Sequence, residues 1–196
     1  MSEARAAAFA SLLMIGCDGP VPATQPGTSG RAPSEGTEST GAPESLEGSA
    51  SLIDLAAFEK SYPDEDPFED RPADVQCEFG FGLEDGFFEV ETDLCHYGGF
   101  VQPSLAPIRE GDTIDFLLLH ENLVSSDPAA EVHLALAFGS EVVFETVIQI
   151  PTEANFVAEA WVSGSDVPAG TPIHLHLHNH GINSYRVSAL SVTYSD

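Results

Sequence analysis

The chain has 196 residues, of which 42% are hydrophobic, which is enough for one folded domain of ordinary size. Its 32 acidic residues against 6 basic ones give a formal net charge of −26 at pH 7. This charge argues against nucleic acids and anionic membrane surfaces as partners, because binding them requires clustered Lys and Arg. Cations, polar sugars and basic protein patches are compatible with it, as is a surface kept soluble by self-repulsion alone.

The first seventeen residues are organised like a secretory signal. Arg5 supplies the charge, and an apolar run from 6 to 15 follows, too short to span a membrane, which takes about 20 apolar residues. The tetrapeptide from Met14 to Cys17 resembles the lipobox of bacterial lipoproteins. The resemblance implies that residues 1–16 are a signal peptide, that Cys17 is lipidated, and that the protein is anchored to a membrane of the bacterial cell envelope, at the outer membrane or cell surface.

Residues 17–74 are predicted to form a disordered tether. The first part is rich in Gly, Pro, Ser and Thr and cannot bury enough apolar surface to fold. Residues 52–60 predict one short helix, with Ser51 as a cap, which either packs on the domain or folds on a partner. Residues 62–70, with two prolines among their carboxylates, are interpreted as an extended acidic spacer, with loose calcium binding as the alternative.

Residues 75–196 predict an all-β domain, because short apolar or alternating runs recur about every ten residues between Gly, Pro, Asp and Asn. Alternation within 131–138 assigns Val132 and every second residue after it to the core, and His133 to the opposite face. The expected strands are Phe87–Thr92, Thr113–Leu119, Glu131–Phe138, Glu141–Ile150, Asn155–Val162, Pro172–His178 and Tyr185–Tyr194.

Two of the three cysteines lie in this domain. If Cys17 carries a lipid, Cys77 and Cys95 remain as an even pair in an exported protein, the setting in which disulfides persist. A disulfide is therefore predicted. The rival interpretation is a catalytic or metal-binding pair of Cys95 and His96, but adjacent strand residues face opposite sides and converge poorly on one atom.

Chemistry is concentrated in the segment from Ile173 to His180, where histidines alternate with apolar residues. On a strand, His174, His176 and His178 would form a ladder on one face at steps of about 6.6 Å. Histidines spaced in this way can share a zinc or copper ion with a ligand from a neighbouring strand. The candidates for that further ligand are His133, His120 and Glu131.

The ladder has two other interpretations: a hydrogen-bonded polar face without a ligand, or a face that binds sugar or a protein partner. No serine or cysteine nucleophile is tied by sequence to a His and an acid, so a binding or structural module is expected rather than an enzyme. The alternative is a metal-binding protein or metalloenzyme that uses the ladder.

The last strands, from His178 to Tyr194 with turn residues at 179–181, resemble the closing hairpin of galactose-binding-like and carbohydrate-binding sandwiches. The resemblance implies a jelly-roll-like antiparallel β-sandwich and a carbohydrate as one candidate ligand. The sequence therefore predicts a lipid-anchored, disulfide-containing β-sandwich at the cell envelope.

Overall fold

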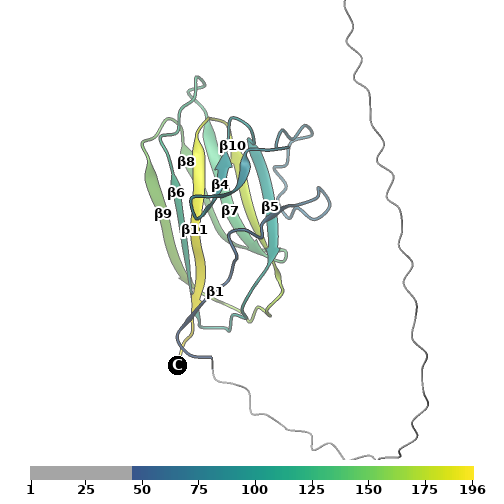
Figure 1. Cartoon of the computed structure of the whole chain (residues 1–196), viewed down its shortest axis with the longest axis vertical. Coiled ribbons are helices and arrows are strands. Elements are labelled where there is room, and N and C mark those ends of the chain that lie inside the picture. Colours follow the sequence, from purple (N-terminus) through teal and green to yellow (C-terminus); the bar gives the residue numbers. More distant parts are fainter. Residues whose placement is uncertain (1–45) are drawn as a thin grey trace, which may run out of the picture. The chain divides into compact units, whose positions relative to one another are not determined.

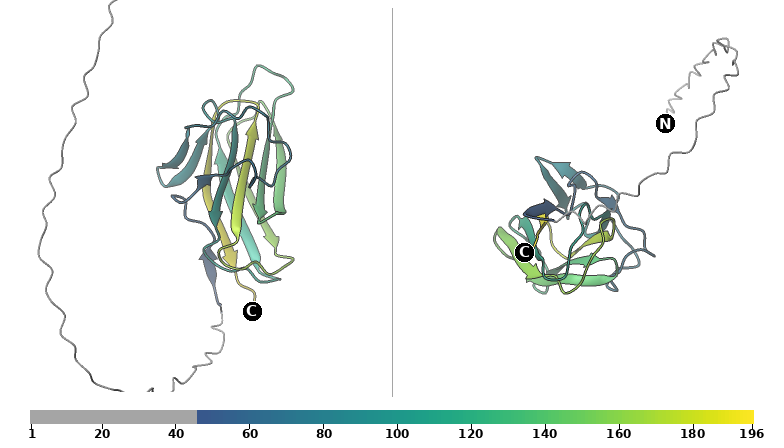
Figure 2. Two further views of the ribbon diagram at one scale, coloured as in Figure 1. Left: turned by 90° about the vertical axis from the view of Figure 1, so that its right-hand side faces the viewer. Right: turned by 90° about the horizontal axis from the view of Figure 1, so that it is seen from below.

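The computed structural model describes residues 46–196, so the predicted signal peptide and the lipidation site Cys17 lie outside the described residues. The described part consists of eleven strands and connecting loops, arranged in two antiparallel sheets that pack face to face (Figures 1 and 2). Within residues 46–196 there is no helix of the length and apolarity needed to cross a membrane. The predicted all-β class is confirmed.

One sheet has six strands. They are β1 (Ser49–Ser51), β3 (Phe81–Glu84), β4 (Phe87–Glu91), β6 (Thr113–His120), β9 (Asn155–Val162) and β11 (Ser184–Thr193). Their order is β3-β4-β11-β6-β9, and β1 pairs with the end of β11 that β4 leaves free.

The other sheet has five strands. They are β2 (Glu59–Lys60), β5 (Tyr97–Pro103), β7 (Glu131–Phe138), β8 (Glu141–Gln149) and β10 (Pro172–Asn179), in the order β2-β5-β10-β7-β8. Without the short strands β1 to β3, the two sheets have the orders 4-11-6-9 and 5-10-7-8. This is the strand order of a jelly roll, so the predicted architecture is confirmed.

All seven predicted strands are present, because their apolar or alternating runs can turn apolar side chains toward the space between the sheets. The longest strand that the sequence did not indicate is β5, which contains Gly98 and Gly99. Glycine is depleted in strands, since it has no side chain to pack. A side chain at Gly98 would clash with the ring of Phe100, which fills the core at that point.

The predicted helix at 52–60 is wrong. Leu52 and Ile53 are buried in the sandwich core, and Leu52 N donates a hydrogen bond to Leu190 O as the chain leaves β1. Asp54 Oδ1 accepts a hydrogen bond from Ala56 N and closes a turn. An isolated helix of this length is marginal in water, whereas the free edge of β11 offers backbone partners and the core offers apolar contacts.

The folded unit begins earlier than residue 75, the boundary that the sequence indicated. The described residues from 46 onward belong to the same compact unit as the sandwich. The acidic stretch at 62–70, interpreted from the sequence as an extended spacer, packs on the five-stranded sheet. Its contacts are described below.

The predicted disulfide is confirmed: Cys77 and Cys95 are bonded, and both are fully buried. The bond joins the segment before β3 to the segment after β4 and so fixes the base of that hairpin. The rival interpretation, a catalytic or metal-binding pair of Cys95 and His96, is excluded, because the Cys95 sulfur is bonded to Cys77.

Candidate metal centre

Strand β10 presents its histidines on one face, as the alternation predicted. Ile173, Leu175 and Leu177 lie in the core, each at most 2% exposed, and the three alternating histidines face outward from the five-stranded sheet. Strand β7 lies beside β10 and places His133 directly opposite His178 in the register. The neighbouring outward positions on β7 are alanines, Ala135 and Ala137, which leave space above the sheet.

That space is filled by residues 61–71, which we call the acidic strap. Ser61 N donates a hydrogen bond to Gly99 O, and the ring of Phe68 lies on the two alanines and stacks on the His176 ring at 4.3 Å. The ladder is therefore covered: His176 is fully buried and His174 is 7% exposed.

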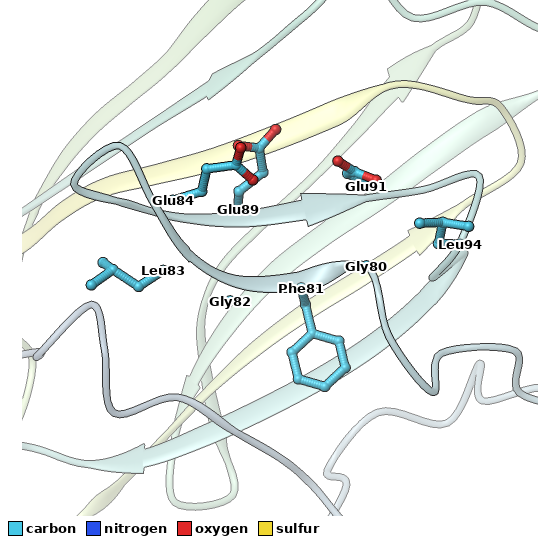
Figure 3. Close-up of a pocket in the computed structure, with 8 residues that line it drawn as sticks. All are labelled: Gly80, Phe81, Gly82, Leu83, Glu84, Glu89, Glu91 and Leu94. Carbon is cyan, nitrogen blue, oxygen red and sulfur yellow. The ribbon is translucent and has the colours of Figure 1, made fainter.

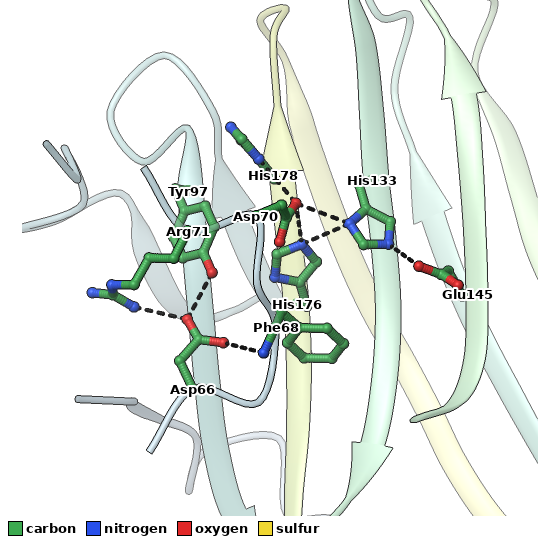
Figure 4. Close-up of polar contacts among 9 residues, drawn as sticks. All are labelled: Asp66, Phe68, Asp70, Arg71, Tyr97, His133, Glu145, His176 and His178. Atoms are coloured by element: carbon green, nitrogen blue, oxygen red, sulfur yellow. Dashed lines mark hydrogen bonds and ion pairs between the residues drawn. The ribbon is translucent and has the colours of Figure 1, made fainter. Parts of the chain in front are cut away.

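A second set of contacts holds the middle of the acidic strap. Asp66 Oδ2 accepts hydrogen bonds from Tyr97 Oη at 2.7 Å and from Arg71 Nη1 at 2.8 Å, and Asp66 Oδ1 accepts one from Phe68 N (Figure 4). The Arg71 guanidinium lies 5.2 Å from the centre of the Tyr97 ring. These contacts fix the position of Asp70, the residue before Arg71.

Asp70 brings the histidines of the two strands together. Its Oδ2 lies 3.0 Å from His133 Nδ1, 3.1 Å from His176 Nε2 and 3.0 Å from His178 Nδ1. His133 Nδ1 and His176 Nε2 are themselves 3.0 Å apart, so Asp70, His133 and His176 form a triangle of donor atoms (Figure 4). Among the described residues this is the group of three His, Cys, Asp or Glu side chains with all donor atoms within 4.8 Å of one another.

The protonation states follow from burial and from the neighbouring charges. Burial raises the pKa of Asp70, but hydrogen bonds and charge from the three histidines outweigh it and lower this pKa to about 2. Burial lowers the pKa of His176 to about 4. For His133, burial is outweighed by Asp70 and Glu145, which raise its pKa. At neutral pH the site thus contains an ionised carboxylate and a neutral His176, the forms in which these side chains bind metals.

This donor set fits a transition-metal ion. Ligands at 2.0–2.2 Å from a tetrahedral zinc ion lie about 3.3 Å from each other, close to the 3.0–3.1 Å sides of the triangle. Glu145 Oε1 lies 2.7 Å from Nε2 of His133, the ring nitrogen that does not face the triangle. Carboxylates in this position typically orient a metal-binding histidine.

The predicted ladder is only partly gathered at this point. His176 and His133 belong to the triangle, and His178 touches Asp70 without belonging to it. His174 lies at the other end of the ladder, where its Nδ1 is buried and has no hydrogen-bond partner in the part of the chain that the structure describes. Of the other candidates, His120 lies in the six-stranded sheet, and Glu131 accepts a hydrogen bond from Gln149.

Sequence reasoning missed Asp70 and Glu145. Glu145 pairs with Ala135 in the β7–β8 register. The predicted hairpin therefore places Glu145 on the strand next to His133, but only the register shows that the two side chains are close. Asp70 lies in a segment without periodicity, and only its place in an acidic run distinguishes it. A hollow of about 380 Å³ borders the centre, lined by Asp70, Glu131, His133, Glu145, Val147, His178 and His180.

A second hollow, of about 310 Å³, lies at the β3–β4 hairpin and contains Glu84, Glu89 and Glu91 (Figure 3). Glu89 is already paired with Arg186 through contacts of 3.0 and 3.1 Å. Hydrogen bonds and charge from Arg186 and Ser184 outweigh burial and lower the pKa of Glu89. The carboxylates of this hollow therefore do not form a cluster of donor atoms like the one at Asp70, His133 and His176.

No protein-family model matches the chain. No curated protein matches it either. Among solved structures, it is similar to an arabinose-bound GH51 α-L-arabinofuranosidase, with 10% identity, a TM-score of 0.42, and coverage of 74% of this chain but only 26% of the enzyme.

Two smaller structures are matched over nearly their whole length. One is a family 11 carbohydrate-binding module from Clostridium thermocellum in complex with a mixed-linked tetrasaccharide, with 14% identity, a TM-score of 0.39, and coverage of 77% of this chain and 98% of the module. The other is an adhesin domain of Lys-gingipain from Porphyromonas gingivalis, with 12% identity, a TM-score of 0.39, and coverage of 76% and 98%. Each of these TM-scores is below 0.5, so the similarity supports no conclusion about the function or ligand of this chain.

Proposed function

We propose that the protein binds one divalent transition-metal ion, zinc or copper, through Asp70, His133 and His176. The observation that carries the proposal is the convergence of one carboxylate oxygen and two imidazole nitrogens, from three separate segments, to within 3.0–3.1 Å of one another. Imidazole and carboxylate donors suit both metals. The three donors leave a coordination position for water, for an outside ligand, or for His178 after a small movement.

The test is metal uptake by the full-length chain without a histidine tag, measured by calorimetry and elemental analysis at pH 7.5. About one zinc or copper ion per chain should bind. Asp70→Asn, which keeps the shape of the side chain, and His176→Ala should each remove most of the affinity, because each deletes one of three donors.

Matched controls are His180→Ala, which borders the hollow but lies outside the triangle, and His96→Ala, which is not among the clustered donors. Both should bind the ion like the unchanged chain. If no stoichiometric metal binds, or if Asp70→Asn and His176→Ala bind it normally, the metal proposal fails. A polar face for a carbohydrate or protein ligand would then be favoured.

We also propose that the domain is held at the bacterial cell envelope by a lipid on Cys17. The lipobox-like tetrapeptide supports this, and so does the Cys77–Cys95 disulfide, because such bonds form and persist in exported proteins. Cys17→Ser should abolish acyl labelling and release the protein from the membrane fraction. Unchanged retention and mass in this variant would contradict the proposal.

A further inference from the structure

The acidic strap is docked on a domain of the same charge. Residues 61–71 contain five carboxylates and one arginine, and residues 75–196 contain eighteen acidic residues against Arg109 and Arg186. Docking therefore brings like charges together. The polar attraction between the acidic strap and the sheet is concentrated at Asp66, which accepts a hydrogen bond from Tyr97, and at Asp70, which faces the histidines.

The docked acidic strap also leaves polar groups beneath it without partners. The Nδ1 atoms of His174 and His176 are buried and have no hydrogen-bond partner among residues 46–196. A buried polar group in this state destabilises the arrangement that buries it, because the group loses its bonds to water. One apolar side chain, Phe68, supplies the stacking contact on His176.

From these observations we infer that the ion at Asp70, His133 and His176 controls the position of the acidic strap, raising the population in which residues 61–71 are docked on the five-stranded sheet. The inference rests on the proposed metal binding. A divalent cation adds two positive charges where the acidic strap meets β7 and β10 and bonds Asp70 to both strands. Release of the acidic strap would uncover an outer face that contains Tyr97, His174 and His176.

The coupling must be reciprocal. If the ion favours the docked acidic strap by a given factor, the docked state must bind the ion more tightly than the undocked state by the same factor. A variant that undocks the acidic strap can therefore lose up to that factor in affinity. Phe68 packs the acidic strap on the sheet and offers no ligand atom, so a substitution of Phe68 changes docking without removing a metal ligand. Tyr62 lies in the same segment and is 69% exposed, which makes it a matched control.

The test is hydrogen–deuterium exchange of the full-length chain with and without saturating zinc, with zinc affinity measured in parallel by calorimetry. Exchange in residues 61–71 should slow by about tenfold or more with zinc, a coupling of ordinary size. Exchange in β6 and β9, on the other sheet, should not change. Phe68→Ala should speed exchange in residues 61–71 without zinc and weaken zinc binding by up to the same factor, whereas Tyr62→Ala should do neither.

The outcomes separate the two proposals. Stoichiometric zinc binding with unchanged exchange in residues 61–71, or with unchanged affinity in Phe68→Ala, would overturn control of the acidic strap and leave metal binding in place. Absence of zinc binding in calorimetry would overturn both.

Discussion

At the scale of single residues, Asp112 shows how one buried carboxylate joins distant parts of the chain. It is fully buried, and its oxygens accept hydrogen bonds from Ser195 N and Arg109 N, each at 2.8 Å, and from Ser195 Oγ at 3.0 Å. Burial raises the pKa of Asp112, but the hydrogen bonds from Ser195 and Arg109 outweigh it and lower this pKa to about 2. The carboxylate thus stabilises the fold only in its ionised form.

We expect Asp112→Asn to lower the free energy of unfolding at pH 7 by about 2 kcal/mol, because an amide cannot accept all of these bonds. The folded pKa is lower than the unfolded pKa, so the contribution of Asp112 is present above about pH 4 and disappears as the pH falls toward 2. Urea unfolding of both proteins at pH 7 and pH 2.5 measures this. A stability difference that is the same at both pH values would contradict the prediction.

The candidate centre shows how far residue-level prediction reached. The period of two on β10 correctly placed the histidines on one face, because alternation depends only on local strand geometry. The sequence also indicates His133 as a candidate ligand from a neighbouring strand, and the register places it opposite His178. Asp70 could not be predicted, because its position depends on how a segment without regular structure crosses the completed sheet.

At the scale of elements, the strands that the sequence indicated are apolar or alternating runs without an internal glycine. Strand β5 was missed because tertiary contacts, which the local sequence does not show, require its glycines. Gly99 lies under the acidic strap, where a Cβ would come within 2.5 Å of Ser61 Oγ and 3.1 Å of Asp66 Oδ2. The short segment at 52–60 was misassigned for a related reason, since its backbone partners belong to β11 and β5, forty or more residues away.

Gly99→Ala should therefore disturb the acidic strap while β5 keeps its pairing. We expect a loss of about 1–3 kcal/mol in the free energy of unfolding, the usual cost of overpacking, together with faster hydrogen exchange in residues 61–71. The matched control is Gly164→Ala, where a Cβ would meet nothing within 4 Å. Equal stability of the two variants would show that the acidic strap does not pack closely on β5.

At the scale of the whole molecule, the Cys77–Cys95 bond closes a loop that contains the β3–β4 hairpin, with a sequence separation of 18. Strand β3 is the edge of its sheet and only four residues long, so the covalent link restricts a part of the fold with few contacts of its own. A loop of this size is worth about 3 kcal/mol in the chain-entropy model.

Reduction should accordingly lower the melting temperature by about 6–12 °C, as expected for a chain of this size. Thermal unfolding with and without reductant measures the change, and mass analysis after alkylation under denaturing conditions verifies that the bond is broken. An unchanged melting temperature in protein shown to be reduced would mean that the hairpin is held by packing alone.

The Arg109 side chain lies where the two ends of the described chain meet: its Nη2 is 3.0 Å from Ser195 O and 3.5 Å from Leu46 O. Strand β1 pairs with the last residues of β11 at this end (Figure 1). At the opposite end, where β11 starts, Tyr185 Oη donates a hydrogen bond of 2.9 Å to Asn179 Oδ1, and His178 precedes Asn179 on β10. The ten residues of β11 separate the two ends by about 30 Å. The two ends of the sandwich therefore differ, and coupling the domain to a bead, a chip or a fusion partner at the end where Leu46 and Ser195 meet should keep the attachment away from the hollow beside Asp70 and His178.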